Sequence, residues 1–538
     1  MFLLAFVYLL LATIPQSKSP VPSHIFFHFD PLVWLTTWIA SRTFYQGMLL
    51  SLVTIVVTLV LGRVFCGWFC PMGTVIDLSD RFILGLKRRL PKGRKAERLD
   101  VHWPTDRLVG LKYVILIGVL VAAAFGTQAA YLFDPFAILY RSLMMIFYPA
   151  IHFGGRFLHG HISGFNALGL IDFTMERVYY QGHMVSLVLF AGILALGAYG
   201  RRYWCRNLCP LGGGLALLSR YPILRRKVTE ACTSCSRCRT LCKMASISGE
   251  YHHTLMPECI QCYACVPVCP PKATSIRFRV KKAGCAYEPD ITRRRILQGV
   301  GLGAAFLVAA KAGSAAKQSV RGLPIASDML IRPPGALREE LFNEACTRCG
   351  ECIKVCPTNG IQAAIAEAGF DGFMSPVLIP RVGHCMAACK ACGEVCPTGA
   401  ILPFDTVEKK WLYIASANID RSKCIVWYKN AVCTVCDEHC SYDAIYQQEV
   451  DGNRKPFVND EVCIGCGECE RVCPIQPVAA IRVYSHGERR EKSRSQQLSD
   501  RRAAPLSADQ TTDPDVESAS YRTVAGKEVY VPPTRPKY

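Results

Sequence analysis

The chain has 538 residues, of which 51% are hydrophobic and 19% charged, and it carries a formal net charge of +20 at pH 7. This length allows roughly three or four domains. The positive charge lies largely in short basic stretches beside apolar runs, such as residues 87–95 and 293–295, which is typical of the cytoplasmic flanks of membrane spans. The composition therefore favours a membrane portion joined to soluble modules and argues against nucleic acid as a partner.

The cysteine content excludes a disulfide scaffold. The chain contains 29 cysteines, of which 24 form six quartets, four form two shorter motifs, and Cys285 stands alone. Disulfide-rich secreted domains are usually short and lack a repeated four-cysteine unit. The cysteines therefore predict metal binding.

Apolar stretches in the first 200 residues predict membrane spans, each of which requires about 20 mostly apolar residues. They are residues 1–15, 43–62, 113–133 and 178–200, and the last three lack Asp, Glu, Lys and Arg. Basic residues in 81–107 and after residue 200 predict cytoplasmic loops, so residues 17–42 and 134–177 are expected to face outward. Residues 1–225 are thus expected to form an α-helical transmembrane domain.

A repeated Cys-x3-Cys-Pro motif follows two of these spans. It reads FCGWFCPMG at residues 65–73 and WCRNLCPLG at residues 204–212. Both copies are expected at the cytoplasmic membrane edge, where the repeat can bring together the candidate redox residues Cys66, Cys70, Cys205 and Cys209. These cysteines would hold an additional metal or cluster, or act as redox thiols beside quinol. Alternatively, each Cys-Pro pair only starts a helix, since proline suits the first helical turn.

Residues 226–290 contain two quartets and predict a cytoplasmic ferredoxin-like domain. The quartets are Cys232, Cys235, Cys238 and Cys242, and Cys259, Cys262, Cys265 and Cys269. Their C-x2-C-x2-C-x3-C spacing is that of bacterial ferredoxins, in which the fourth cysteine binds the neighbouring 4Fe–4S cluster. We therefore expect Cys269 to complete the first site and Cys242 the second. Zinc sites favour paired C-x2-C knuckles instead.

Residues 291–315 predict a twin-arginine-like membrane segment. TRRRILQ at 292–298 precedes the short apolar run GVGLGAAFLVAA, and paired arginines before such a run are typical of signals that export folded proteins. The alternative is an ordinary fifth span with a basic flank. The glycine pattern lacks the strand and the acidic residue of a nucleotide site.

Residues 335–485 contain four more quartets and predict a periplasmic ferredoxin-like domain. The cysteines are Cys346, Cys349, Cys352 and Cys356; Cys385, Cys389, Cys392 and Cys396; Cys424, Cys433, Cys436 and Cys440; and Cys463, Cys466, Cys469 and Cys473. Adjacent and nested exchange of the fourth cysteines both remain open. The charged and polar tail, residues 486–538, is expected to be disordered.

The predicted chemistry is one-electron transfer through six 4Fe–4S clusters, since cysteine thiolates with sulfide hold iron in such clusters. The sequence lacks C-x-x-C-H, so covalent haem c is not indicated. It also lacks a GKS or GKT phosphate loop, and no nucleotide is expected. The fold class is accordingly an α-helical membrane domain, with about four spans and one signal-like span, joined to two α+β ferredoxin-like iron–sulfur modules.

These motifs resemble known families. Residues 1–285, with the spans, the Cys-x3-Cys-Pro repeat and two quartets, look like NapH-type membrane ferredoxin proteins, and residues 290–485 resemble NapG/MauM-type ferredoxin proteins. The resemblance implies a fusion of two subunits that, in the periplasmic nitrate reductase system, form a quinol dehydrogenase. Here the arginine signal is internal, and Lys243 replaces the proline after Cys242. NosR-like and FixG-like proteins share part of the layout.

The leading functional prediction is a quinol dehydrogenase of the bacterial inner membrane. It would pass electrons from the quinone pool to a periplasmic cytochrome or reductase. The alternatives are a non-catalytic electron-transfer or assembly subunit and a FixG-like metal reductase. Quinol oxidation needs a proton acceptor, and the candidates near the outer side of the spans are His152, His159, His161, His183, Asp134 and Glu176.

Overall fold

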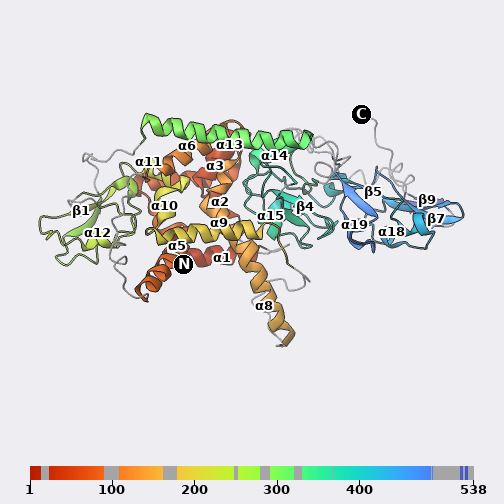
Figure 1. Ribbon diagram of the computed structural model, residues 1–538, viewed down its shortest axis with the longest axis horizontal. Coiled ribbons are helices and arrows are strands. Elements are labelled where there is room, and N and C mark those ends of the chain that lie inside the picture. Colours follow the sequence, from red (N-terminus) through yellow and green to blue (C-terminus); the bar gives the residue numbers. More distant parts are fainter. Residues whose placement is uncertain are drawn as a thin grey trace.

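The computed structural model describes residues 1–13, 24–89, 108–161, 178–247, 253–278, 291–319, 330–365 and 367–485, residue 488, and two short strands near the C-terminus. The described residues form an elongated body with three parts (Figure 1). A helical domain, residues 1–221 and 291–319, lies in the middle. The two-quartet module, residues 222–278, lies at one end, and the four-quartet module, residues 330–485, lies at the other (Figure 1).

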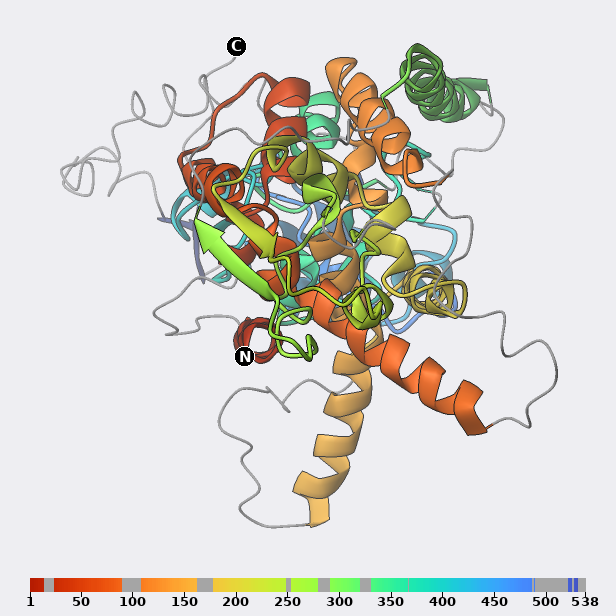
Figure 2. The ribbon, with the colours of Figure 1, turned by 90° about the vertical axis from the view of Figure 1, so that its left-hand side faces the viewer.

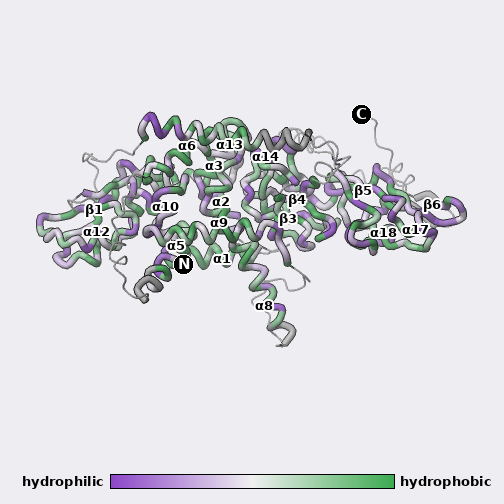
Figure 3. The backbone as a smooth tube through the Cα atoms, viewed as in Figure 1, coloured by the Kyte–Doolittle hydropathy of each residue, from purple (hydrophilic) through white to green (hydrophobic). Residues whose placement is uncertain are grey.

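The helical domain is built from α-helices. Its α-helices are α1 (Phe2–Ala12), α2 (Ile25–His28), α3 (Pro31–Ser41), α4 (Leu49–Leu61), α5 (Pro71–Arg89), α6 (Leu111–Ala124), α7 (Pro135–Ser142), α8 (Tyr148–His161), α9 (His183–Ala195), α10 (Tyr203–Asn207), α11 (Pro210–Leu218) and α13 (Arg293–Ser319). Helices α5 and α8 project away from the body in both views (Figures 1 and 2). Hydrophobic residues are concentrated along the central helices (Figure 3).

Two repeated dipeptides start four of these helices. Asp30 caps α3, where its Oδ1 accepts from the Leu32 amide at 2.8 Å, and Asp134 caps α7, where its Oδ2 accepts from the Ala137 amide at 2.7 Å. In both cases proline occupies the first turn, where its missing N–H costs nothing. Pro71 and Pro210 of the Cys-x3-Cys-Pro repeat begin α5 and α11 in the same way.

The helices in the predicted spans are shorter than expected. Helices α1, α4, α6 and α9 have 11, 13, 14 and 13 residues, because turns with glycine at positive φ, at Gly62 and Gly126, follow α4 and α6. By length and composition, the described residues contain one helix able to cross a membrane, Pro135–Phe157. The sequence had assigned this segment to an outer loop. The four-span domain therefore stays a prediction.

The signal-like segment is part of α13, a continuous helix of 27 residues, and two of its glycines, Gly299 and Gly303, pack against α6. A Cβ on Gly299 would lie 2.7 Å from the Ile117 Cβ, and a Cβ on Gly303 would lie 2.8 Å from the Gly118 carbonyl oxygen. Small residues spaced by four allow such close approach of two helix backbones. The glycine pattern thus has a packing role.

Both modules combine short helices with antiparallel strand pairs. The two-quartet module contains β1 (Leu224–Val228), α12 (Arg237–Leu241) and β2 (Thr274–Phe278), with β1 paired to β2. The four-quartet module contains α14 (Glu339–Ala345), α15 (Glu351–Lys354), β3 (Ile361–Ala363), β4 (Pro376–Leu378), α16 (Ala391–Glu394), β5 (Ser416–Ile419), α17 (Ile425–Lys429), α18 (Val435–Glu438), β6 (Ile445–Val450), β7 (Asn453–Val458), α19 (Glu468–Val472) and β8 (Ile481–Tyr484). Its pairs are β3–β4, β5–β8 and β6–β7.

One hydrophobic core joins the four-quartet module to the helical domain. It runs without a break from residues of α1, α6 and α7 to residues of α14, β3 and β8. Near the C-terminus, β9 (Tyr521–Val524) pairs with β10 (Lys527–Tyr530); the rest of the predicted disordered tail, apart from residue 488, lies outside the described residues.

Candidate metal centres

The two-quartet module groups its cysteines as the ferredoxin spacing predicts. Cage 2 is a pocket lined by Cys242, Cys259, Cys262 and Cys265. Cage 1 comprises Cys232, Cys235, Cys238 and Cys269. Cys232 and Cys235 lie close enough to Cys238 for their thiols to interact electrostatically, and Arg226, whose Nη2 donates to the Cys238 Sγ at 3.4 Å, also interacts electrostatically with Cys269.

Left-handed backbone turns wrap the standard cysteine runs. In each run the second and fourth residues after the first cysteine have positive φ. These pairs are Ser234 and Ser236, Gln261 and Tyr263, Arg348 and Gly350, and Gly465 and Gly467. The amides of Gln261, Arg348 and Gly465 donate to the thiols two residues earlier. Such turns direct successive thiols and amides toward one centre, which suits a cluster that is stabilised by hydrogen bonds to sulfur.

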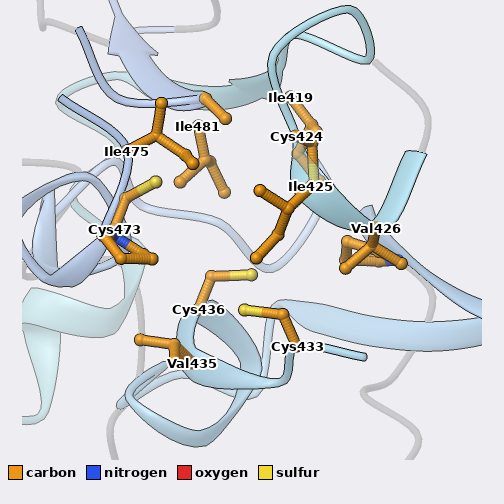
Figure 4. A pocket seen from close by; sticks show the side chains of 13 residues that line it. Ile419, Cys424, Ile425, Val426, Cys433, Val435, Cys436, Cys473, Ile475 and Ile481 are labelled. Atoms are coloured by element: carbon orange, nitrogen blue, oxygen red, sulfur yellow. The ribbon is translucent and has the colours of Figure 1, made fainter. Parts of the chain in front are cut away.

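In the four-quartet module, adjacent runs exchange their fourth cysteines. Electrostatic coupling among the thiols and the lining of two pockets define four groups. Cage 3 is Cys346, Cys349, Cys352 and Cys396; cage 4 is Cys385, Cys389, Cys392 and Cys356; cage 5 is Cys463, Cys466, Cys469 and Cys440; and cage 6 is Cys424, Cys433, Cys436 and Cys473. The thiols of cage 6 point toward a common centre (Figure 4). The nested alternative is therefore wrong.

The four cages form a row whose order differs from the order of the runs along the chain. Cages 3 and 4 meet where Cys392 lies near Cys352. Cages 4 and 5 meet where the Cys385 amide donates to the Cys466 carbonyl oxygen at 2.8 Å, and cages 5 and 6 meet near Cys469. The third run along the chain thus supplies most of cage 6, at the far end of the row.

The thiols of the six cages are suited to bind metal clusters, because metal binding would remove their protons. Burial and the neighbouring thiols raise the pKa of Cys436 to about 12, and burial likewise raises the pKa of Cys466 to about 12 despite an amide from Glu468. Free thiols would therefore stay protonated at neutral pH, whereas metal binding favours the thiolate. Among the described residues, no three His, Cys, Asp or Glu side chains are placed to hold a single metal ion.

Cage 3 is anchored to the helical domain by buried polar contacts. The Tyr140 hydroxyl on α7 donates to the Glu351 Oε2 at 2.9 Å, and the Lys354 Nζ donates to the Thr13 carbonyl oxygen at 2.8 Å. The Arg348 Nη1 donates to the Gln128 carbonyl oxygen, also at 2.8 Å. Glu351, Lys354 and Arg348 are at most 3% exposed. Since buried charges require such partners, these contacts hold the first cage of the row against the helical domain.

The Cys-x3-Cys-Pro repeat forms a seventh group of cysteines at the opposite end of the helical domain. Cys66, Cys70, Cys205 and Cys209 are close enough for their thiols to interact electrostatically. The group adjoins cage 2, because the Trp68 Nε1 donates to the Gln261 carbonyl oxygen at 2.8 Å. The structure thus brings together the four candidate redox cysteines.

The described proton-acceptor candidates have different surroundings. His152 is buried, and the His183 Nδ1 lies 2.9 Å from the Tyr180 carbonyl oxygen. Asp134 is buried close to the carboxyl of Asp30, and one oxygen of each carboxyl, the Asp30 Oδ2 and the Asp134 Oδ1, has no hydrogen-bond partner among the described residues. The sequence analysis missed Asp30, although the Phe-Asp-Pro sequence at 29–31 recurs at 133–135. The side chains of His159 and His161, and Glu176 as a whole, lie outside the described residues.

Together, the cages define an iron–sulfur electron-transfer protein of the ferredoxin type. Family models described as 4Fe-4S binding domains match residues 43–91 and 183–229, residues 340–362, and residues 256–279, and a 4Fe-4S dicluster domain matches residues 431–476. No solved structure matches the chain.

Similar proteins of known sequence show to which family of ferredoxin-type proteins the chain belongs. The ferredoxin-type protein NapG of Escherichia coli is 30% identical over 203 residues, which are 36% of this chain and 85% of NapG. The methylamine utilization ferredoxin-type protein MauM of Methylophilus methylotrophus is 33% identical over 168 residues, which are 30% of this chain and 73% of MauM. An uncharacterized protein of Methanocaldococcus jannaschii is 29% identical over 43% of this chain and 78% of its own length. The chain therefore belongs to the NapG/MauM family of ferredoxin-type proteins.

Proposed function

We propose that this protein is a membrane-bound quinol dehydrogenase that passes electrons through 4Fe–4S clusters to a periplasmic acceptor. The observation that carries the proposal is the row of cages 3 to 6, which begins at buried contacts with the helical domain and ends at cage 6. A cluster bound in each cage would supply one-electron transfer. Cage 6, at the free end of the row, is where we expect the acceptor to dock.

Exposed apolar faces on the helical domain support a membrane location. Large apolar side chains with 37–71% exposure line α4, α9 and α13; they are Leu49, Leu52, Val53, Val56, Leu59, Val60, Met184, Leu187, Val188, Leu189, Ile296, Leu297, Val300, Leu302 and Val308. Apolar faces of this extent mark membrane or partner contacts. In this proposal the two-quartet module is cytoplasmic and the four-quartet module periplasmic, because basic flanks favour the cytoplasmic side of a membrane.

The buried carboxyl pair is suited to the protons that quinol releases. Asp30 and Asp134 are 0% and 1% exposed, and because two ionised carboxyls this close would repel each other, the pair is suited to take up a proton. The positive charge of Arg141 interacts with the Asp134 carboxyl, and the Arg141 side chain lies close to Gly350, which belongs to the cysteine run of cage 3. Ionisable groups inside a membrane domain are functional candidates by default. We therefore assign proton acceptance to this pair, with the electrons entering at cage 3.

The test is reduction of the clusters by quinol. Protein purified anaerobically in detergent is mixed with a reduced short-chain quinol, and the clusters are followed by electron paramagnetic resonance. We expect reduction without any partner subunit. If dithionite reduces the clusters but quinol does not, the protein is a non-catalytic electron-transfer subunit instead. Cys285→Ser, which alters the one cysteine outside all groups, is the control and should behave as the unmodified protein.

A further inference from the structure

The Cys-x3-Cys-Pro repeat is part of a longer motif with an arginine and a glycine at matched positions. Residues 63–73 read RVFCGWFCPMG and residues 202–212 read RYWCRNLCPLG. Both copies therefore follow the pattern Arg-x2-Cys-x3-Cys-Pro-x-Gly. A helix start requires the proline alone, so the arginine, the two cysteines and the glycine need a separate explanation.

Each arginine crosses to the other copy of the motif. The Arg202 Nη1 donates to the Cys66 carbonyl oxygen at 2.9 Å, and its Nη2 donates to the Gly73 carbonyl oxygen at 3.2 Å. In return, the Arg63 Nη2 lies 3.0 Å from the position that a Cβ on Gly212 would take. The equivalent Cβ on Gly73 would lie 3.3 Å from the Arg202 Nη2. The two glycines thus leave space for the guanidinium groups, which are 0% and 2% exposed.

Hydrogen-bond donors point at the sulfurs of this group. The Gly212 amide donates to the Cys209 Sγ at 3.3 Å, and the Gly73 amide makes the matching bond to the Cys70 thiol. The Arg63 Nη2 lies 3.9 Å from the Cys66 Sγ. Amide-to-sulfur hydrogen bonds also occur in the cages described above, and they tune the potential of a bound cluster.

Positive charge exceeds negative charge around the four thiols. Arg63 and Lys112 share Glu258, at 3.5 Å and 2.5 Å, and all three side chains are almost completely buried. On the other side, Arg202 and Lys243 share Asp77, at 2.7 Å and 2.6 Å, while the Asp80 Oδ2 accepts from the Arg202 amide.

These seven groups carry one more positive than negative charge when all are ionised. Four protonated thiols would add no negative charge to offset this excess, of which only the 29% exposed Lys243 is open to solvent. A cluster held by four thiolates has a net negative charge, so it would balance the site.

We propose that Cys66, Cys70, Cys205 and Cys209 bind a seventh 4Fe–4S cluster between the helical domain and cage 2. Each copy of the motif supplies two ligands, one guanidinium and one glycine. The family model described as a 4Fe-4S binding domain matches residues 43–91 and 183–229, which include these four cysteines and no others. The cluster would extend the row of cages 1 and 2 to the helical domain. Binding stands on the geometry alone, whereas a role in quinol-driven transfer rests on the proposed function.

The experiment counts iron, sulfide and zinc in anaerobically purified full-length protein. We expect about 28 iron and 28 sulfide per chain rather than about 24, with four of each per cluster. The double variant Cys66→Ser/Cys205→Ser should lose about four of each and retain the signals of the other clusters, and Cys285→Ser should lose none. The iron and sulfide content of the unmodified protein tests the proposal even if the double variant does not fold.

Two results would overturn the seventh cluster. One is an iron content of about 24 per chain in the unmodified protein, and the other is one zinc per chain that disappears in the double variant. Quinol-driven reduction of unmodified protein is measured separately. A failure there would reject the proposed function while leaving the iron count to judge the seventh site.

Discussion

The glycine contact between α6 and α13 allows a prediction with its own internal control. In Gly303→Ala, the new Cβ would lie 2.8 Å from both the Gly118 carbonyl oxygen and the Val121 Cβ. In Gly301→Ala, two residues away on the same helix, the new Cβ would meet nothing within 4 Å. Both changes replace glycine by alanine in a helix, so they share the same gain in helix propensity of about 1 kcal/mol.

The difference between the two variants therefore isolates the helix contact. A Cβ at 2.8 Å from backbone must push the helices apart, and overpacking of this kind typically costs about 1–3 kcal/mol. Gly301→Ala should be as stable as the unmodified protein or more stable, and Gly303→Ala should be less stable than Gly301→Ala by about 1–3 kcal/mol. The measurement is unfolding by denaturant under anaerobic conditions, followed by circular dichroism in detergent. Equal midpoints and equal slopes for the two variants would show that α13 does not pack on α6 as described.

Three further predictions concern the cages, the carboxyl pair and the topology. Cys346→Ser/Cys396→Ser should remove one cluster, or about four iron, whereas Cys346→Ser/Cys356→Ser should remove two clusters; equal losses would refute adjacent exchange. Asp134→Asn should slow cluster reduction by quinol at least tenfold and leave reduction by dithionite unchanged, because the amide cannot accept the proton; an unchanged quinol rate would exclude the pair. Reporters fused after the two-quartet module and after the four-quartet module should report cytoplasm and periplasm respectively, and the same compartment for both would contradict the proposed orientation.

The sequence by itself determined the chemistry of the cages, because cluster ligation is encoded locally. The C-x2-C-x2-C spacing places three thiols within seven residues, and the left-handed turns between them form within the same few residues. Gly350, Gly465 and Gly467 were visible signals of these turns, because glycine adopts positive φ without steric cost. The exchange between Cys242 and the Cys259 run also followed from spacing, since the two runs are close in the chain.

Only the tertiary structure decided how distant segments meet. The grouping of Cys473 with the Cys424 run, and of Cys440 with the Cys463 run, depends on strand pairs such as β5–β8 that join residues far apart in sequence. The meeting of Asp30 with Asp134, and of Cys66 with Cys205, likewise depends on how the two halves of the helical domain pack. Hydropathy located the apolar helices but not their ends, because local turns end them. Hydropathy also does not distinguish a residue that faces lipid from one in a protein core, since apolar side chains are found in both environments. A local pattern specifies ligands and turns, whereas long-range packing selects which of several locally equivalent partners come into contact.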